Sequence, residues 1–165
     1  MTPIQDCIKN KNTSLNPIWI MRQAGRYLPE FREIRAQNSD FIKLCLNESL
    51  STEITLQPIK RFNFDAAIIF SDILMLPFGL GQEVKFEKGL GPKLGELNLD
   101  LIENVSKDEF TKKLNPIYKS ISNISANPIC KNKDIIGFVG APWTILVYMI
   151  NKMSPKKNLS KEIFE

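Results

Sequence analysis

Residues 66–70 read AAIIF, a continuous apolar run rather than one that alternates with polar residues. Two other short runs have the same character, IWIM at 18–21 and IIGFV at 135–139. Continuous apolar runs are typical of strands in a parallel sheet that helices cover on both faces. The sequence therefore predicts three buried strands at these positions.

The segments between these runs indicate helices. Pro29 suits the first turn of a helix, and Asn47 is a candidate cap for a second helix over residues 48–61. Pro58 lies inside that second helix, where a proline is expected to kink it or end it early. The order along the chain is strand, helices, strand.

The second half of the chain begins with a glycine-rich stretch at 77–95, which predicts a long loop with a hairpin near 83–87. It contains neither of the common nucleotide-phosphate motifs. Residues 101–124 have apolar positions spaced by threes and fours, so we expect an amphipathic helix packed on a sheet. After the third predicted strand, a sharp turn at 140–142 leads into an apolar helix at 143–150.

Buried strands that alternate with helices predict a parallel α/β fold in a single domain, residues 1–165, with a further helix starting near 160. A complete (β/α)8 TIM barrel needs roughly 200–250 residues. A chain of 165 residues with three strands would be an incomplete barrel of this kind. A small three-layer sandwich is the alternative that the pattern leaves open.

The amino-acid composition argues against several classes of protein and of active site. The chain is 43% apolar with a net charge of +4, and three scattered cysteines, Cys7, Cys45 and Cys130, suggest reduced thiols rather than disulfides. The sequence has no histidine, which removes histidine-based nucleophilic machinery and the commonest metal ligand from these residues. Neither an export signal nor a membrane span is visible, so a soluble cytoplasmic protein is expected.

Residues that follow the predicted strands are candidates for function, since active sites of parallel α/β proteins form at the carboxyl ends of strands. Arg22 and Arg26 follow the first run, and guanidinium forks match carboxylates. A solvated basic helix start is the alternative. Asp72 follows the second run, where it could accept hydrogen bonds from ligand N–H groups or cap the next helix. Trp143 and Tyr148 follow the third run, as core residues or as ligand contacts.

Three motifs in order resemble one known family. MRQAGRYLPEF at 21–31, AAIIFSDIL at 66–74 and GFVGAPWT at 137–144 are similar to the signatures of the uroporphyrinogen decarboxylase family. The likeness runs from about residue 16 to residue 150. It implies that this chain is an incomplete amino-terminal part, with about three strands, of a distorted (β/α)8 barrel. The barrel is expected to work as a homodimer, without cofactor or metal, and to bind neither nucleic acid nor membrane.

The resemblance also implies roles for individual residues. Arg22 and Arg26 would bind substrate carboxylates and position the reacting acetate, with Arg35 a weaker candidate for an outlying carboxylate. Asp72 would accept hydrogen bonds from pyrrole N–H groups. The implied substrate contacts are Arg22, Gln23, Ala24, Gly25, Arg26, Arg35, Asp72 and Tyr148, and Asp72, Arg22 and Arg26 are the implied catalytic residues.

The implied reaction converts uroporphyrinogen III to coproporphyrinogen III by loss of four CO2 molecules from acetate side chains, a step of heme biosynthesis. Because three barrel strands leave sheet edges open, the isolated 165-residue chain is expected to be inactive. One alternative is a methyltransferase of the same superfamily, which binds zinc and acts on corrinoid or methyl-thiol substrates. Another is a non-catalytic fragment that binds tetrapyrroles.

Overall fold

The computed structural model describes residues 1–11, 14, 16–87 and 89–154, and the helix expected from residue 160 lies outside them. The described chain forms two compact units. Unit 1 contains Met1–Ser39, Leu44–Ser71 and Pro116–Phe138. Unit 2 contains Asp40–Lys43, Asp72–Asn115 and the described residues from Val139 onward. Two helices, α3 (Phe41–Cys45) and α7 (Lys107–Ala126), contribute residues to both units.

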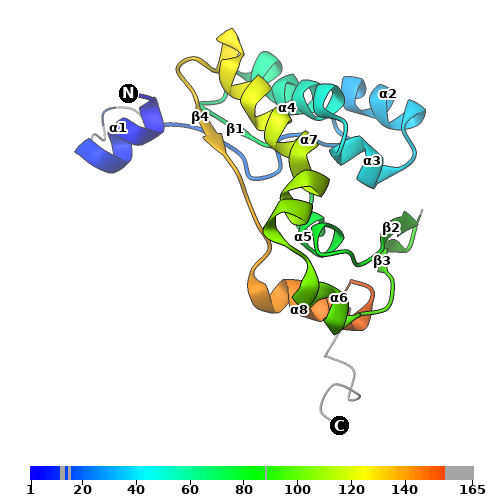
Figure 1. Ribbon diagram of the computed structural model, residues 1–165. Helices are drawn as coiled ribbons and strands as arrows, with labels where there is room; N and C mark the ends of the chain where they lie inside the picture. The colour runs from blue at the N-terminus through cyan, green and yellow to red at the C-terminus, as the bar shows by residue number, and fades with distance from the viewer. Residues whose placement is uncertain (12–13, 15, 88, 155–165) are drawn as a thin grey trace. The chain divides into compact units, whose positions relative to one another are not determined.

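Unit 1 is built on a parallel pair of short strands, β1 (Ala66–Ile68) and β4 (Asp134–Ile136), with Ala67 opposite Ile135. Figure 1 shows the two strands side by side. The remaining elements of the unit are α1 (Pro3–Asn10), α2 (Pro29–Gln37), α4 (Glu48–Phe62), the second half of α7, and the short 3-10 helix η1 (Pro128–Cys130).

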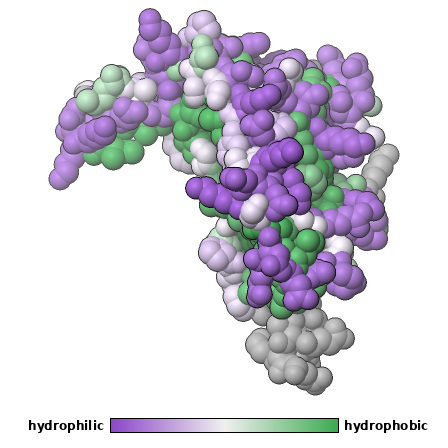
Figure 2. All heavy atoms as spheres, in the orientation of Figure 1, coloured by the Kyte–Doolittle hydropathy of each residue, from purple (hydrophilic) through white to green (hydrophobic). Residues whose placement is uncertain are grey.

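Apolar packing holds α4 and α7 against β1. Ile59 of α4 and Ile124 of α7 are fully buried in one cluster with Ala67 of β1. A second cluster joins α2 to α4 through Phe31 and Ile54. The first helix, α1, has no buried residue, and Figure 2 shows hydrophobic atoms along one side of it.

Hydroxyl groups add directional contacts between α4 and the chain that follows β1. Ser51 Oγ donates a hydrogen bond to the carbonyl oxygen of Phe70 at 2.9 Å, and the amide of Phe70 donates to Thr55 Oγ1 at 2.9 Å. Ser120 of α7 lies 3.2 Å from Ser51, oxygen to oxygen. Both backbone groups of Phe70 are thus satisfied by one helix.

The cap predicted at Asn47 is confirmed, since its Oδ1 accepts a hydrogen bond from the amide of Leu50 at 3.0 Å. We expect Asn47→Ala to lower the free energy of unfolding of the whole protein by about 1 kcal/mol in urea denaturation, because the amide of Leu50 loses its acceptor. Asn123→Ala, on the exposed side of α7, is the matched control. It should stabilise slightly, by up to about 0.5 kcal/mol, because alanine is the better helix former. Equal effects of the two changes would contradict the capping role.

Pro58 was expected to kink α4 or to end it early, and the helix does not end early. The helix continues to Phe62 and closes at Asn63, a residue in the left-handed region whose amide donates to the carbonyl of Ile59. Pro58 is itself almost completely buried. Packing of the last turn against β1 outweighs the hydrogen bond that proline cannot donate.

The strand predicted at residues 18–21 is also wrong. Residues 18–20 have no regular secondary structure and Met21 lies in a turn, and the exposed fractions of the four residues lie between 44% and 70%. Ile18 is hydrogen-bonded to Asp65: its amide donates to Asp65 Oδ2 at 2.7 Å, and its carbonyl accepts from the amide of Asp65 at 2.9 Å. The other two predicted strands exist in shortened form, as β1 and β4.

Unit 2 contains α5 (Met75–Gly79), a hairpin of β2 (Val84–Glu87) and β3 (Gly91–Leu94), α6 (Leu99–Asn104), the first half of α7, and α8 (Pro142–Asn151). The hairpin was predicted, whereas α5 replaces part of the predicted loop. Gln82 links the hairpin to α8, because its Nε2 donates to the carbonyls of Gly95 and Met149.

The single amphipathic helix predicted at 101–124 is in fact two helices. The break is stabilised by a capping box, in which the amide of Glu109 donates to Ser106 Oγ at 3.2 Å and the amide of Ser106 donates to Glu109 Oε2 at 3.0 Å. The predicted apolar face is confirmed on α7, where Leu114, Ile117 and Ile124 are buried. None of the described helices is long and apolar enough to cross a membrane.

Candidate active-site residues

The segment that links residues 18–21 to α2 forms a compact turn with two exposed arginines. The amide of Leu28 donates to the carbonyl of Gly25 at 3.0 Å, and Arg32 Nη1 donates to the carbonyls of Arg26 at 2.8 Å and Tyr27 at 3.3 Å. Arg22 and Arg26 are exposed on this turn, and neither forms an ion pair with a described residue. Two guanidinium groups are therefore available to an anionic ligand.

Gln23 sits inside the same turn and is only 2% exposed. Its Nε2 donates to the carbonyl of Ala66 at 2.7 Å, and its Oε1 accepts from the amide of Ile68 at 3.0 Å. Tyr27 donates its hydroxyl proton to the carbonyl of Gln23. Burial raises the pKa of Tyr27, and the nearby Arg61 only partly offsets this, so the hydroxyl keeps its proton at neutral pH.

Arg35 lies near the end of α2, away from the turn in sequence. Its Nη1 donates to the carbonyls of Asn38 and Ser39 and so satisfies groups at the carboxyl end of the helix. Contact with a substrate carboxylate, the weaker of the roles implied for it, would have to use the other N–H donors of its guanidinium.

Asp72 belongs to unit 2 and lies in the turn that leads to α5. Its Oδ1 accepts from the amide of Leu74 at 2.8 Å, which closes a turn just before the helix. The N-cap of α5 is Leu74 and the helix has no side-chain cap, so the capping alternative is wrong. No described residue donates a hydrogen bond to Oδ2. Burial raises the pKa of Asp72, while the hydrogen bond from Leu74 opposes that shift.

The approach to α8 is closely packed beside Asp72. A Cβ atom on Gly140 would lie 3.2 Å from Cβ of Ile73, the neighbour of Asp72, and would collide with the Ile145 side chain. A larger residue at position 140 would therefore force the Ile145 side chain to shift. On that helix Tyr148 is partly buried, with its hydroxyl 3.4 Å from Ser154 Oγ, and Trp143 is 63% exposed rather than part of the core.

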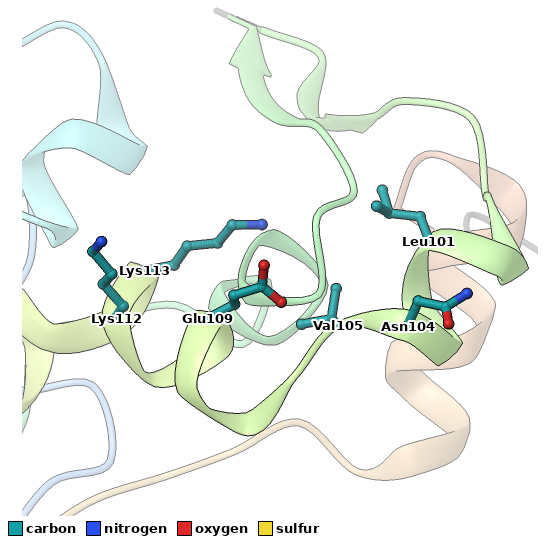
Figure 3. A pocket seen from close by; sticks show the side chains of 6 residues that line it. All are labelled: Leu101, Asn104, Val105, Glu109, Lys112 and Lys113. Atoms are coloured by element: carbon teal, nitrogen blue, oxygen red, sulfur yellow. The ribbon is translucent and has the colours of Figure 1, made fainter.

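Two shallow cavities lie elsewhere. One, of about 380 Å³, is in unit 2. Figure 3 shows the side chains of Glu109 and Lys113 between Lys112 on one side and the α6 residues Leu101 and Asn104 on the other. Its lining residues are Leu101, Asn104, Val105, Glu109, Lys112 and Lys113. The other, of about 510 Å³, is in unit 1 and is lined by Glu30, Glu53, Gln57, Lys60 and Arg61. Neither includes a residue that the sequence singled out.

Sequence reasoning missed three contributors to the arginine turn. It gave no role to the Gln23 side chain, to Tyr27 or to Arg32, all of which hold the turn together. Nothing in the spacing of these residues distinguishes them from ordinary surface residues, because their partners are backbone groups rather than other side chains. Only the fold brings Ala66 and Ile68 within reach of Gln23.

The family model and the curated proteins that match this chain all carry the same name. The family model described as Uroporphyrinogen decarboxylase (URO-D) matches residues 1–164. Among curated proteins, uroporphyrinogen decarboxylase of Cereibacter sphaeroides is 50% identical over 136 residues, which are 81% of this chain and 39% of that protein. The proteins of the same name from Mesorhizobium japonicum and a Chelativorans species are each 46% identical, over 88% and 81% of this chain and 42% and 39% of their own lengths.

The fold and the candidate residues define an α/β protein with two exposed arginines on one turn. The match over almost the whole chain is more specific, since it includes the arginine turn and the segment of Asp72. The chain belongs to the uroporphyrinogen decarboxylase family. It spans about two-fifths of the length of the curated relatives that it matches.

Proposed function

We propose that the whole protein is a carboxy-lyase that converts uroporphyrinogen III to coproporphyrinogen III. The observation that carries the proposal is the arginine turn, in which the exposed Arg22 and Arg26, neither paired with an acidic group of the described residues, flank the buried Gln23. Uroporphyrinogen has eight carboxylates, and a guanidinium stays charged and binds a carboxylate through two parallel hydrogen bonds. Membership of the family supports the same assignment.

Arg22 and Arg26 bind substrate carboxylates in this proposal, and the backbone of Gln23, Ala24 and Gly25 lines the approach to the substrate. Holding one acetate in place restricts its rotation before the reaction begins. Arg35 contributes a weaker contact with a more distant carboxylate. Tyr148 lies beside the bound macrocycle.

Asp72 stabilises the charge that forms during the reaction. A proton adds to the ring carbon next to the one that bears the acetate arm, which makes the ring cationic and spreads positive charge onto the arm-bearing carbon. The bond to the departing CO2 then breaks, and its electron pair forms a double bond between the CH2 group and the ring, which neutralises the ring. A second proton adds to this CH2 group to complete the methyl group, and loss of the first proton from the ring carbon restores the pyrrole. An anionic Asp72 that accepts hydrogen bonds from pyrrole N–H groups lowers the energy of the cationic ring. The carboxylate Oδ2, which no described residue engages, is the atom proposed for this contact.

The proposal extends to the whole protein around this chain. The described α/β units form part of a (β/α)8 barrel within one domain that includes residues 1–165. The active protein is a cytoplasmic homodimer, and it works without cofactor or metal because the substrate ring itself accepts the electrons.

An activity assay tests the proposal directly. The whole protein is incubated with uroporphyrinogen III without oxygen, and the products are oxidised and separated by their number of carboxylates. We expect coproporphyrin, with intermediates of seven, six and five carboxylates. The isolated 165-residue chain should give none of these and should unfold without a sharp thermal transition, because its sheet edges are open. Unchanged substrate with the folded whole protein would overturn the proposed function.

A further inference from the structure

The carboxamide of Gln23 pairs with the free edge of β1 in the way that a strand would. In a parallel sheet, a residue on the neighbouring strand donates to the carbonyl before the residue opposite it and accepts from the amide after it. Gln23 makes this pair of contacts around Ala67, through the carbonyl of Ala66 at 2.7 Å and the amide of Ile68 at 3.0 Å. The side chain thus replaces one residue of a strand.

The geometry fixes the orientation of the amide. The oxygen faces an N–H group and the nitrogen faces a carbonyl, so exchanging the two atoms would put donor against donor and acceptor against acceptor. The opposite edge of β1 is occupied by β4, as shown by the hydrogen bond from the amide of Ile69 to the carbonyl of Ile136 at 3.1 Å. Gln23 therefore satisfies backbone groups that β4 cannot reach.

Further contacts transmit this anchor to the two arginines. Gln23 lies directly after Arg22, and Tyr27 lies directly after Arg26. The Tyr27 hydroxyl donates a hydrogen bond to the carbonyl of Gln23, so this bond closes the turn that bears both arginines. At the other end Leu28 is 1% exposed and packs in the cluster between α2 and α4. The backbone that bears both arginines is held to β1 at one end and to the core of unit 1 at the other.

We propose that Gln23 is a positioning residue, whose side-chain amide holds the Arg22–Arg26 turn against β1 so that both guanidiniums are preorganised for carboxylates. This role rests on the proposed function, because it concerns the binding of the same polycarboxylate. The Gln23 side chain does not contact the substrate, since both its polar atoms are used by β1.

The chain offers a matched control. Gln57 of α4 is also a buried glutamine of unit 1, at 5% exposure, but neither of its amide atoms has a hydrogen-bond partner in the structure. Gln23→Met and Gln57→Met remove the same atoms and keep the same length. Hydrogen exchange at the amide of Ile68, urea unfolding, and binding of uroporphyrin III followed by its fluorescence are measured on the whole protein for each variant.

We expect Gln23→Met to accelerate exchange at Ile68 and to weaken uroporphyrin binding by about tenfold, because misplacement of a binding group by an ångström is costly. Gln57→Met should change neither. Tyr27→Phe removes only the hydroxyl contact with the carbonyl of Gln23, so it should fold normally and bind a few times more weakly. If Gln23→Met does not fold, uroporphyrin binding by Tyr27→Phe tests the positioning role instead.

Two failures can be told apart. If Gln23→Met loses protection at Ile68 but binds uroporphyrin as tightly as the wild type, the positioning role is wrong and the proposed function stands. Unchanged binding by Tyr27→Phe, when Gln23→Met does not fold, has the same meaning. If the folded wild-type protein itself does not bind uroporphyrin, the proposed function falls and the positioning role falls with it.

Discussion

Asp72→Asn should lower the turnover of the whole protein by about 100- to 1000-fold, the loss expected when a group aimed at developing charge is removed. The substitution keeps the size of the side chain and the acceptor that Leu74 uses, but it removes the negative charge. Binding of the neutral-ring substrate should weaken only modestly, because the charge matters most once the pyrrole is protonated. Formation of coproporphyrinogen and binding of uroporphyrin measure the two effects separately.

The control for this prediction is Asp100→Asn, which removes the same charge from an exposed position on α6 of unit 2. It should leave turnover within about twofold, because an exposed charge is screened by solvent. A wild-type rate for Asp72→Asn would refute the proposed role of the carboxylate. An equal loss in both variants would show that net charge, rather than the position of Asp72, is responsible.

The same substitution has an opposite effect on stability, and its sign follows from the raised pKa of Asp72. A raised pKa means that the folded state binds the proton more tightly than the unfolded state. The contribution of Asp72 to stability therefore falls as the pH rises from the ordinary carboxyl pKa of the unfolded chain to the raised pKa of the folded state. The neutral asparagine avoids this loss. Asp72→Asn should therefore be more stable than the wild type at neutral pH, and the difference should vanish below the ordinary carboxyl pKa, as measured by urea unfolding across pH.

Arg22→Ala and Arg26→Ala should each weaken binding of uroporphyrin by about 10- to 100-fold, since a hydrogen bond to a charged group contributes roughly 1.5–3 kcal/mol. Lysine should restore only part of the loss at either position. An ammonium keeps the charge but cannot present the planar pair of donors that a carboxylate matches. Equilibrium binding at a fixed salt concentration measures each change.

Lys60→Ala provides the matched control, because it removes one positive charge from an exposed position on α4 of the same unit. Its binding should stay within about twofold of the wild type at physiological ionic strength, where charges beyond about 8 Å are largely screened. If Lys60→Ala weakened binding as much as Arg26→Ala, attraction to net charge would explain the result, and the specific arginine contacts would be wrong.

Features that depend on one side chain and its own backbone were predictable from the sequence, whereas two features that depend on tertiary packing were predicted wrongly. The cap at Asn47 and the start of α2 at Pro29 were read correctly because each depends on one side chain and its own backbone. The strand expected at 18–21 was wrong because an apolar run predicts burial, and burial depends on what the rest of the fold places against it. Pro58 was misjudged for a related reason, since helix packing outweighed a local penalty.

The candidate site follows the same division. The arginines and Asp72 were found because they follow apolar runs within recognisable motifs, and their roles stay predictions. The anchoring of Gln23 to β1 could not have been found, because a side-chain amide that replaces backbone leaves no pattern in the sequence. For Asp72 the structure shows a hydrogen bond from the amide of Leu74 within the turn before α5 rather than a helix cap, and its contact with a ligand stays a prediction.

The hydroxyl contacts between α4 and Phe70 have a mechanical consequence. Apolar side chains tolerate small sliding motions, because dispersion forces change gradually with distance. The bonds from Ser51 and to Thr55 are directional, so a shift of the helix by one residue would break both at once. These two hydroxyls therefore fix α4 relative to the segment that follows β1, so that the helix and this segment can shift only together.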